Sequence, residues 1–558
     1  MLRALRLLLA AWLFTLSASA PAAATATQDL LLMGRPGGAI AGASVDLNFA
    51  RGQYWLKGAA GPIVNSRASA AWALDSGGNL HACAAFQNCV TDLGVASFEQ
   101  RTNGIRNNTM VGAGAGVNPN FWNIGGSATG LTITATGVST INGMSAITYS
   151  VSGTPTGSGT VLFQMEANSI VTASYGQTWT YSVFVMGSNN TNLGASTGLE
   201  IFQTSPVGLT GFNQNSSLPA TFTKQTFSAT LNNSATAFII PYYQLVVTSG
   251  NPVNLTVTFA APQLELNPNL PASVASATVA GGGAAYVGAS GTMTYSGPGC
   301  TTNPVLNVTT SAGAINAVTS VATAGVCPAA NGLPAAGSTS WTPGGGLSVG
   351  TGASFNLVPT DNSAKAFAHP PILTAGSAVT VNQDKISVAT QPCANPSLLA
   401  IGTPSDPSGN QNFSAILTNV SDTPSTILYR ANNLSYFTAG GSFPGPNTSW
   451  PVGTQGKSAS SVNGTAYKTV FNNGTPGTGT NTALGALNLL GIGNDPVFGG
   501  DSFNGYEREV ALACGTSLTS ASNDVPANDN GPRFAALGDV LAPEEARAAR
   551  SRTFGAAA

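Results

Sequence analysis

The chain has 558 residues, of which only 7% are charged, and its formal net charge is −2. A single hydrophobic core stops growing at about 250–300 residues, so several domains are expected. The few lysines and arginines are scattered along the sequence, and this excludes the basic surface that binding to nucleic-acid phosphates requires.

The first 26 residues have the layout of a secretory signal peptide. Arg3 and Arg6 precede an apolar run that ends at Leu16, and small residues up to Ala26 offer a cleavage site. We therefore expect residues 1–26 to be removed and the mature protein to be secreted or held at the cell surface. A retained N-terminal anchor is the alternative, but the apolar run is short for a membrane-spanning helix, which needs about 20 residues.

The sequence contains six cysteines, and in an exported chain such residues are usually oxidised in pairs. Pairing between neighbours, one of many connectivities open to six cysteines, would place one bridge in each of three segments. These bridges are Cys83–Cys89, Cys300–Cys327 and Cys393–Cys514. A metal site is the competing interpretation, but no CxxC pair occurs, and His81 and His369 lie far apart in the sequence. We therefore expect no metal at the cysteines.

Residues 27–105 are short apolar stretches between turn signals, which predict a small N-terminal β module. From 106 to 268, strand-like runs recur and predict an antiparallel sandwich of roughly eight strands. The alternation of apolar and polar residues is clearest from Trp179 to Val185. Residues 269–290 are rich in Ala, Gly, Ser and Pro, which is typical of a linker.

Residues 291–360 contain short glycine-rich strands and too little chain for a large core, so we expect the Cys300–Cys327 bridge to stabilise this module. From 365 to 521, alternating segments predict a second sandwich. The tail, residues 522–558, is polar and Ala-rich, and we expect it to be disordered. The whole sequence thus predicts an all-β protein, with two antiparallel β-sandwiches joined by a small disulfide-stapled β module.

Several stretches resemble domains of bacteriophage tail-fibre and receptor-binding proteins. Residues 67–78 and 93–103 are similar to the head segment that precedes a carbohydrate-binding jelly roll in such proteins. The sequence RNNTM at 106–110, followed by APQLE at 261–265, resembles carbohydrate-binding modules of the cellulose-binding jelly-roll type. Residues 503–511 are similar to the end of a concanavalin A-like or laminin-G-like lectin domain.

This resemblance implies a glycan or a cell-envelope polysaccharide as the partner. Residues 313–318, with 350–353, resemble the glycine-rich β repeats of phage fibres. Phage virion proteins do not normally carry an export signal. The signal peptide therefore indicates a prophage-derived or borrowed set of domains that is used at a bacterial surface.

Sugars are bound on sandwich faces by aromatic rings, amides and carboxylates. The candidates in the first sandwich are Trp122, Tyr242, Tyr243 and Gln244. The candidates in the second sandwich, in or beside turn-rich segments, are Tyr429, Tyr436, Phe437 and Trp450. Core packing is the alternative for each ring, and one of the two adjacent tyrosines must point inward because residues alternate along a strand.

Candidate catalytic residues are scarce. Asp495, Asp501, Glu507 and Glu509 are close in sequence, but solvated turns and strand edges explain them better than the paired carboxylates of a glycosidase. Neither histidine lies in a nucleophile motif. We predict no enzyme and no cofactor. Calcium is the one ion that the sequence leaves open, through the oxygen ligands of Asn494, Asp495 and Asp501.

The leading hypothesis is therefore an exported, non-catalytic glycan-binding or adhesion protein. One alternative is a structural fibre or envelope component without sugar binding, for which a homo-oligomer would be expected. The other alternative is a polysaccharide depolymerase.

Overall fold

The computed structural model shows a chain of β-strands and turns. It describes residues 45–49, 53–56, 59–188, 192–205, 207–267, 270–366, 368–393 and, between 396 and 514, the strands with short adjoining segments. Within these ranges no α-helix occurs, so the all-β prediction is confirmed. None of the described segments forms a helix with the length and hydropathy of a membrane span. The predicted signal peptide, 1–26, and the predicted tail, 522–558, lie outside the described residues.

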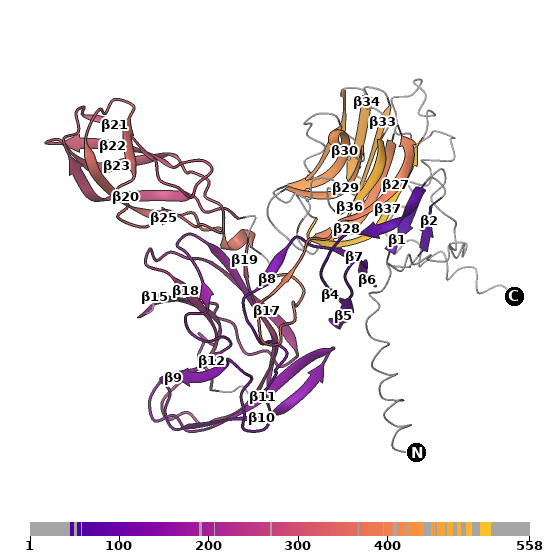
Figure 1. Cartoon of the computed structure of the whole chain (residues 1–558). Coiled ribbons are helices and arrows are strands. Elements are labelled where there is room, and N and C mark those ends of the chain that lie inside the picture. Colours follow the sequence, from indigo (N-terminus) through magenta and orange to yellow (C-terminus); the bar gives the residue numbers. More distant parts are fainter. Residues whose placement is uncertain are drawn as a thin grey trace, which may run out of the picture.

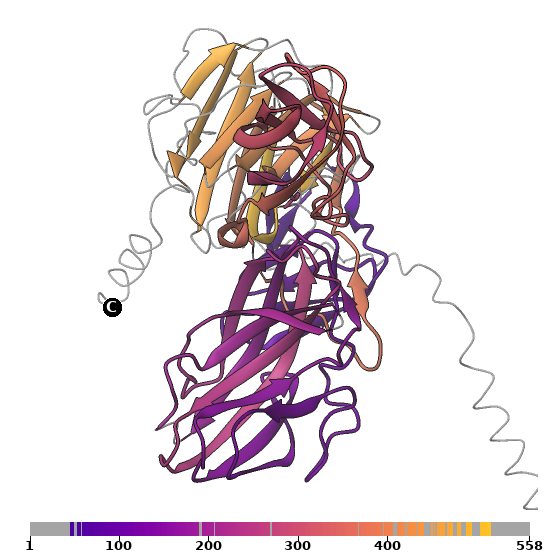
Figure 2. The same ribbon diagram turned by 90° about the vertical axis from the view of Figure 1, so that its left-hand side faces the viewer.

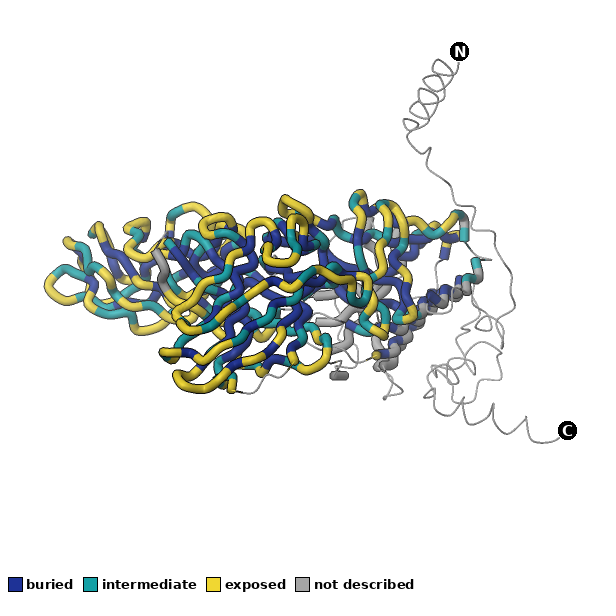
Figure 3. The backbone as a smooth tube through the Cα atoms, turned by 90° about the horizontal axis from the view of Figure 1, so that it is seen from below, coloured by how far each residue is buried: buried dark blue, intermediate teal, exposed yellow. Residues whose placement is uncertain are grey.

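Three lobes, each with its own hydrophobic core, make up most of the described part of the chain (Figure 1). The first sandwich (purple) lies at the bottom of this view, the module that follows it in sequence at the upper left, and the C-terminal sandwich at the upper right. Figure 2, turned by 90°, shows the long strands of the first sandwich running beside one another. Buried and exposed residues interchange at short intervals along the backbone (Figure 3), as expected for strands with one face on a core.

The first sandwich consists of two antiparallel sheets around one core. The five-stranded sheet has the order β10 (Leu131–Ile141), β11 (Met144–Gly153), β19 (Val253–Leu266), β14 (Thr178–Ser188) and β17 (Thr223–Thr230). The six-stranded sheet has the order β16 (Val207–Asn213), β15 (Gly198–Ser205), β18 (Phe238–Val247), β12 (Gly159–Gln164) and β9 (Asn123–Gly126), with β13 (Val171–Thr172) paired to β18.

Aromatic rings fill the centre of this core. Phe259 of β19 contacts Phe163 and Tyr243 of the opposite sheet, with ring centroids 5.0 Å apart in both pairs. Tyr149 of β11 lies 5.0 Å from Phe163. Such tilted pairs contribute about 0.5–1.5 kcal/mol each beyond the area that they bury. They therefore fix how the two sheets pack on each other.

The middle module is larger than the sequence predicts, because its first strand lies in the expected linker. Its four-stranded sheet has the order β23 (Ala314–Thr323), β22 (Val305–Ser311), β21 (Ser290–Tyr295) and β24 (Trp341–Gly344). Its two-stranded sheet pairs β20 (Val274–Ala284) with β25 (Thr351–Pro359). The ring of Trp341 packs 4.8 Å from that of Phe355 and joins the two sheets.

The interpretation of residues 269–290 as a linker is therefore wrong, and the glycines explain why. A Cβ atom at Gly282 would lie 2.5 Å from the carbonyl oxygen of Ile315, and one at Gly283 would lie 2.3 Å from that of Thr351. Here the small residues allow neighbouring backbones to approach closely. The Gly- and Ala-rich composition that predicted a flexible linker thus allows this strand to pack closely against its neighbours.

The C-terminal sandwich has two antiparallel sheets with a common core. The nine-stranded sheet contains β2 (Gln53–Trp55), β1 (Val45–Asn48), β37 (Gly505–Cys514), β28 (Pro396–Pro404), β33 (Gly456–Asn463), β34 (Ala466–Phe471) and β35 (Gly477–Thr480), with β7 (Gly94–Ser97) and β6 (Cys89–Thr91) attached to β37. The seven-stranded sheet has the order β3 (Ala59–Asn65), β27 (Ile386–Cys393), β36 (Leu487–Ile492), β29 (Asn410–Thr418), β30 (Ser421–Ala431), β31 (Leu434–Ala439) and β32 (Thr448–Ser449).

The expected N-terminal module, 27–105, is therefore not a separate domain over its described residues. Val45, Leu47 and Phe49 lie in the same core as Val510 of β37. These apolar stretches are too short to form a core of their own, so they complete a sheet with strands such as β28 and β37, which lie more than three hundred positions later. The C-terminal sandwich is thus discontinuous, and the first sandwich and the middle module lie between its two parts in sequence.

Two short pairs of strands lie outside these sandwiches: β4 (Ala71–Leu74) with β5 (Leu80–Cys83), and β8 (Arg101–Asn103) with β26 (Val379–Val381). The disulfides follow neighbour pairing, as predicted: Cys83–Cys89, Cys300–Cys327 and Cys393–Cys514. The last of them joins β27 to β37 and so connects the two sheets of the C-terminal sandwich. Disulfides are compatible with an extracellular protein.

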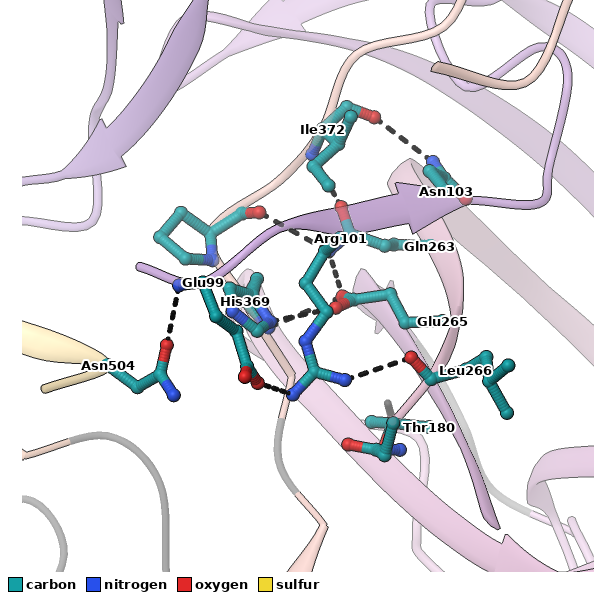
Figure 4. Close-up of polar contacts among 12 residues, drawn as sticks. Glu99, Arg101, Asn103, Thr180, Gln263, Glu265, Leu266, His369, Ile372 and Asn504 are labelled. Atoms are coloured by element: carbon teal, nitrogen blue, oxygen red, sulfur yellow. Dashed lines mark hydrogen bonds and ion pairs between the residues drawn. The ribbon is translucent and has the colours of Figure 1, made fainter. Parts of the chain in front are cut away.

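A buried polar cluster lies where the first sandwich meets the chain that enters and leaves it (Figure 4). Arg101 of β8 pairs with Glu99 and donates a 2.9 Å hydrogen bond to the carbonyl of Leu266. The Nδ1 atom of His369 lies 2.9 Å from a carboxylate oxygen of Glu265. Burial lowers the pKa of His369, so its neutral ring donates to the carboxylate at pH 7.

Glu265 is the last residue of the APQLE sequence that resembled the closing strand of a sugar-binding module. Burial alone would raise the pKa of this carboxyl group, but His369 and Arg101 hold it below the ordinary value. Lys224 also reaches the cluster and donates a 2.6 Å hydrogen bond to the carbonyl of His369. These charges therefore connect chain segments and do not face a ligand.

Candidate functional site

The outer face of the six-stranded sheet carries the candidate site. Phe163 is paired with Tyr243 on one side and with Ile124 on the other, and all three face the core of the first sandwich. Because side chains alternate along a strand, the residues between these positions point away from the core. One row of directly paired residues crosses five strands there, from β16 to β9. This row, called the polar row below, consists of Asn213, Glu200, Tyr242, Gln164 and Asn123.

Glu200 is the most unusual member of the polar row. It is only 8% exposed, and its carboxyl group forms no hydrogen bond or ion pair with another described residue. Burial raises its pKa to about 7. The side chain lies over β16, where a Cβ atom on Gly211 would come within 2.0 Å of its Oε1 atom. Neither of its oxygens is among the fully buried side-chain atoms that lack a partner, so solvent reaches the carboxyl group and it has capacity for further hydrogen bonds.

Two aromatic rings lie beside this carboxyl group. Tyr242 is half-buried and is the direct partner of Glu200 on β18. Burial raises the pKa of its phenol, and the nearby charge of Glu200 raises it further, so the hydroxyl group stays protonated and can donate. Phe202, two residues after Glu200, contacts the tyrosine ring at a centroid distance of 6.0 Å. The middle of the face thus combines a carboxyl group, a phenol and an apolar ring.

Amides occupy the rest of the row. Gln164 is buried, and its Nε2 atom donates to the carbonyl of Glu166 and to Oδ1 of Asn168, both at 2.7 Å. The amide hydrogens of Gln164 are therefore already used. Asn123 and Asn213, at the two ends of the row, are exposed. The exposed amides at the two ends, the phenol of Tyr242 and the carboxyl group of Glu200 supply the donors and acceptors that suit a ligand with many hydroxyl groups.

An ion pair lies beyond Gln164 at the end of β12. Arg106 contacts the carboxylate of Glu166 at 2.7 Å, and its guanidinium group lies 4.0 Å from the ring centroid of Phe121. Phe121 is 39% exposed. The charge of Arg106 is thus matched by its own partner.

Of the two adjacent tyrosines predicted as candidates, the structure places Tyr242 on the outer face and Tyr243 in the core. Tyr243 is fully buried and packs on Phe259, so its assignment to a site is wrong. The alternation of the strand requires this outcome, but the sequence alone did not say which of the two rings points inward.

The prediction that Trp122 and Gln244 bind a glycan is also wrong, because both side chains are already buried and hydrogen-bonded. The indole Nε1 of Trp122 donates a 2.9 Å bond to the carbonyl of Asn107, and the residue is 8% exposed. Gln244 points to the outer side of its sheet, but it is 5% exposed and its amide donates a 2.7 Å bond to the carbonyl of Ser196. The hydrogen bonds to Asn107 and Ser196 therefore hold these two side chains inside the fold, where they do not contact a ligand.

The candidates in the C-terminal sandwich stay predictions. Tyr429 in β30 and Tyr436 in β31 are direct cross-strand partners in the backbone register, and Phe437 is opposite Leu428. The side chains of these residues, and Trp450 as a whole, lie outside the described part of the structure.

The acidic residues near the C-terminus show one difference from the prediction. Glu507 is fully buried in β37, and burial raises its pKa well above the ordinary value, so it is not a solvated strand-edge acid. Asp495 and Asp501 lie outside the described residues, as does the side chain of Glu509. Among the described side chains, no group of three or more could hold a metal ion. Calcium through Asn494, Asp495 and Asp501 is therefore not tested.

Glu200, Phe202 and Gln164 were not among the site residues predicted from the sequence. A signal for the first two was present: in the segment from Leu199 to Phe202, two apolar residues alternate with an acid and an aromatic ring. A single acid on the polar side of a strand is notable in a chain with only 7% charged residues. The cross-strand alignment with Gln164 had no signal, because it depends on pairing between distant segments.

No family model matches the chain, and no curated protein matches it. Similar solved structures include the CBM40 module of the Ruminococcus gnavus IT-sialidase, bound to α2,3 sialyllactose, at 12% identity and a TM-score of 0.18 over 22% of this chain and 75% of that one. The alginate lyase from Corynebacterium sp. is similar at 15% identity and a TM-score of 0.16, over 26% of this chain and 70% of that one. At these values neither a ligand nor an activity carries over to this chain.

Proposed function

We propose that this is an exported, non-catalytic glycan-binding protein, and that its ligand lies along the polar row of the first sandwich. The observation that carries the proposal is the carboxyl group of Glu200, buried without a described partner next to the rings of Tyr242 and Phe202. A sugar supplies what this group lacks, because its hydroxyl groups donate hydrogen bonds while its C–H faces pack on aromatic rings.

The length of the polar row favours an oligosaccharide over a single sugar. Five strands at a spacing of about 4.8 Å give a row of about 19 Å between its ends. The exposed amides of Asn123 and Asn213 stand at these ends, where further sugar units could reach them. A polysaccharide of a cell envelope is therefore the ligand class that we propose.

Localisation outside the cell is part of the proposal. It is supported by the signal-peptide layout of residues 1–26 and by the disulfides of the described chain. The resemblance to phage tail-fibre domains supports adhesion at a bacterial surface as the biological role. Nucleic acid is not proposed as a partner, because the chain has no basic surface in its sequence.

Calorimetric titration with a panel of oligosaccharides tests the proposal. We expect binding in the micromolar to millimolar range, a loss of at least tenfold in Tyr242→Ala, and no change in the control Val138→Ala. Val138 is an exposed residue of β10 on the opposite sheet. Binding that survives Tyr242→Ala unchanged, or no binding to any glycan of the panel, would overturn the proposal.

A depolymerase is the second candidate, because a carboxyl group with a pKa of about 7 is half protonated at neutral pH and could act as a general acid. A glycosidase would also need a second carboxylate, and Glu166 is occupied by Arg106. We therefore favour binding without catalysis. Release of reducing ends that disappears in Glu200→Gln would establish the enzyme instead.

The structural fibre remains the third candidate, and it is the one for which homo-oligomers matter. Light scattering of the full chain distinguishes it. A stable trimer or filament that binds no glycan would favour the fibre, whereas a monomer that binds glycans supports our proposal.

A further inference from the structure

We infer that the polar row selects neutral glycans over acidic ones, and that Glu200 is the residue that determines this selectivity. The inference rests on the proposed function and names the ligand class of the same site. Acidic glycans here means chains that carry carboxylates, such as uronates or sialic acids. Neutral glycans means chains with hydroxyl groups alone.

The charges that face the site carry the argument. Glu200 comes from β15, and its row partners on the other strands are uncharged: Tyr242, Gln164, Asn123 and Asn213. Beyond the row, Glu166 is matched by Arg106 at 2.7 Å. An ionised Glu200 therefore leaves the described part of this face with a net charge of about −1 and no unmatched cation.

The burial of Glu200 makes this charge effective. At 8% exposure, water screens it less than a surface carboxylate. At an intermediate effective dielectric, the Coulomb repulsion between Glu200 and a sugar carboxylate about 5 Å away would weaken the binding of an acidic glycan by roughly a hundredfold. Screening by salt and relaxation of the protein reduce this loss of affinity to about tenfold. A sugar hydroxyl group at the same place donates to Glu200 and meets no such repulsion.

The hydrogen-bonding chemistry points in the same direction. A carboxylate only accepts hydrogen bonds, so an ionised Glu200 can pair with hydroxyl donors but not with a second carboxylate. Two carboxyl groups at one site can share a proton while Glu200 is protonated, and a sugar carboxylate beside it would raise the pKa of Glu200 further. The selectivity should therefore be measured under alkaline conditions.

The test is a titration of the full chain at pH 8.5 with neutral hexasaccharides of xylose, mannose and glucose and with acidic hexasaccharides of galacturonate and mannuronate. We expect the best neutral ligand to bind at least about tenfold more tightly than either acidic one. In Glu200→Gln this ratio should fall at least about fivefold. In Asn213→Asp, which places a second carboxylate beside the first in the row, the ratio should rise.

Thr134→Asp is the matched control, because it adds the same charge on an exposed position of β10, on the opposite sheet. The ratio should stay unchanged in this variant. Equal or tighter binding of the acidic hexasaccharides by the wild type, or a ratio that does not move in both Glu200→Gln and Asn213→Asp, would overturn the inference and leave the proposed function standing. No binding to any of the five hexasaccharides would overturn both.

Discussion

Replacing Arg67 with methionine tests the discontinuous sandwich most directly. Its fully buried side chain pairs with Asp384, just before β27. The same guanidinium group donates to the carbonyls of Ala84 and Gln87, at 3.0 Å each. One side chain thus connects the segment after β3, the loop closed by Cys83–Cys89 and the chain that returns to the C-terminal sandwich.

The magnitude follows from what Arg67→Met leaves behind. Burial already raises the pKa of Asp384 even with the guanidinium group beside it. Without its partner this buried carboxyl group must ionise alone or bind a proton, and breaking such a pair costs about 3–5 kcal/mol. For a sandwich of this size, the loss corresponds to a decrease of about 10 °C in the melting temperature.

Scanning calorimetry and hydrogen exchange measured peptide by peptide provide the assay, since a protein with several domains has no single unfolding transition. We expect faster exchange in β3, β27 and β37, with β14 and β19 of the first sandwich unchanged. The defect should be smaller at pH 5 than at pH 8, because protonation of Asp384 removes the unpaired charge. Equal melting temperatures, or a loss confined to the first sandwich, would refute the assignment of these strands to one domain.

Three further predictions concern other parts of the chain. Burial raises the pKa of Glu200 from 4.5 to about 7, so the wild type should lose stability relative to Glu200→Gln as the pH rises from 4.5 to about 7, with no further loss above that. Melting temperatures of the two proteins that change in parallel with pH would contradict this. Gly282→Ala should destabilise the middle module by about 1–3 kcal/mol, whereas Gly114→Ala, with nothing within 4 Å of the added atom, should have a much smaller effect in thermal melts. Replacing Cys300 and Cys327 with serine should cost about 3 kcal/mol and expose the module to limited proteolysis, and unchanged digestion would argue against the bridge.

The alternation of apolar and polar residues predicted most of the strands that could be recognised from the sequence. The run from Trp179 to Val185 lies inside β14, as its pattern indicates. The same local signal cannot say which distant segment a short strand will join. The stretch from Val45 to Phe49 is compatible with any sheet edge, and its pairing with β37 depends on a partner at the other end of the chain.

The candidate site shows the same division between local and distant information. Tyr242 was found because aromatic rings in strands are visible in the sequence, and Trp122 was chosen by the same rule although its indole is needed inside the fold. Glu200 and Gln164 become neighbours of Tyr242 only through the register of β15, β18 and β12. Such a register is set by side-chain packing across the whole sheet and not by any one segment.

The pairing of β1 with β37 also constrains the order in which the protein can mature. The first described strand, β1, must wait for a partner that ends at Cys514, so this lobe closes only after β37 has been made. The first sandwich and the middle module have their residues contiguous in sequence and can fold while synthesis or export continues. Until the last strand arrives, the apolar edge formed by Val45 and Leu47 is open to wrong partners. The bridge between Cys393 and Cys514 then secures a closure that depends on the arrival of β37.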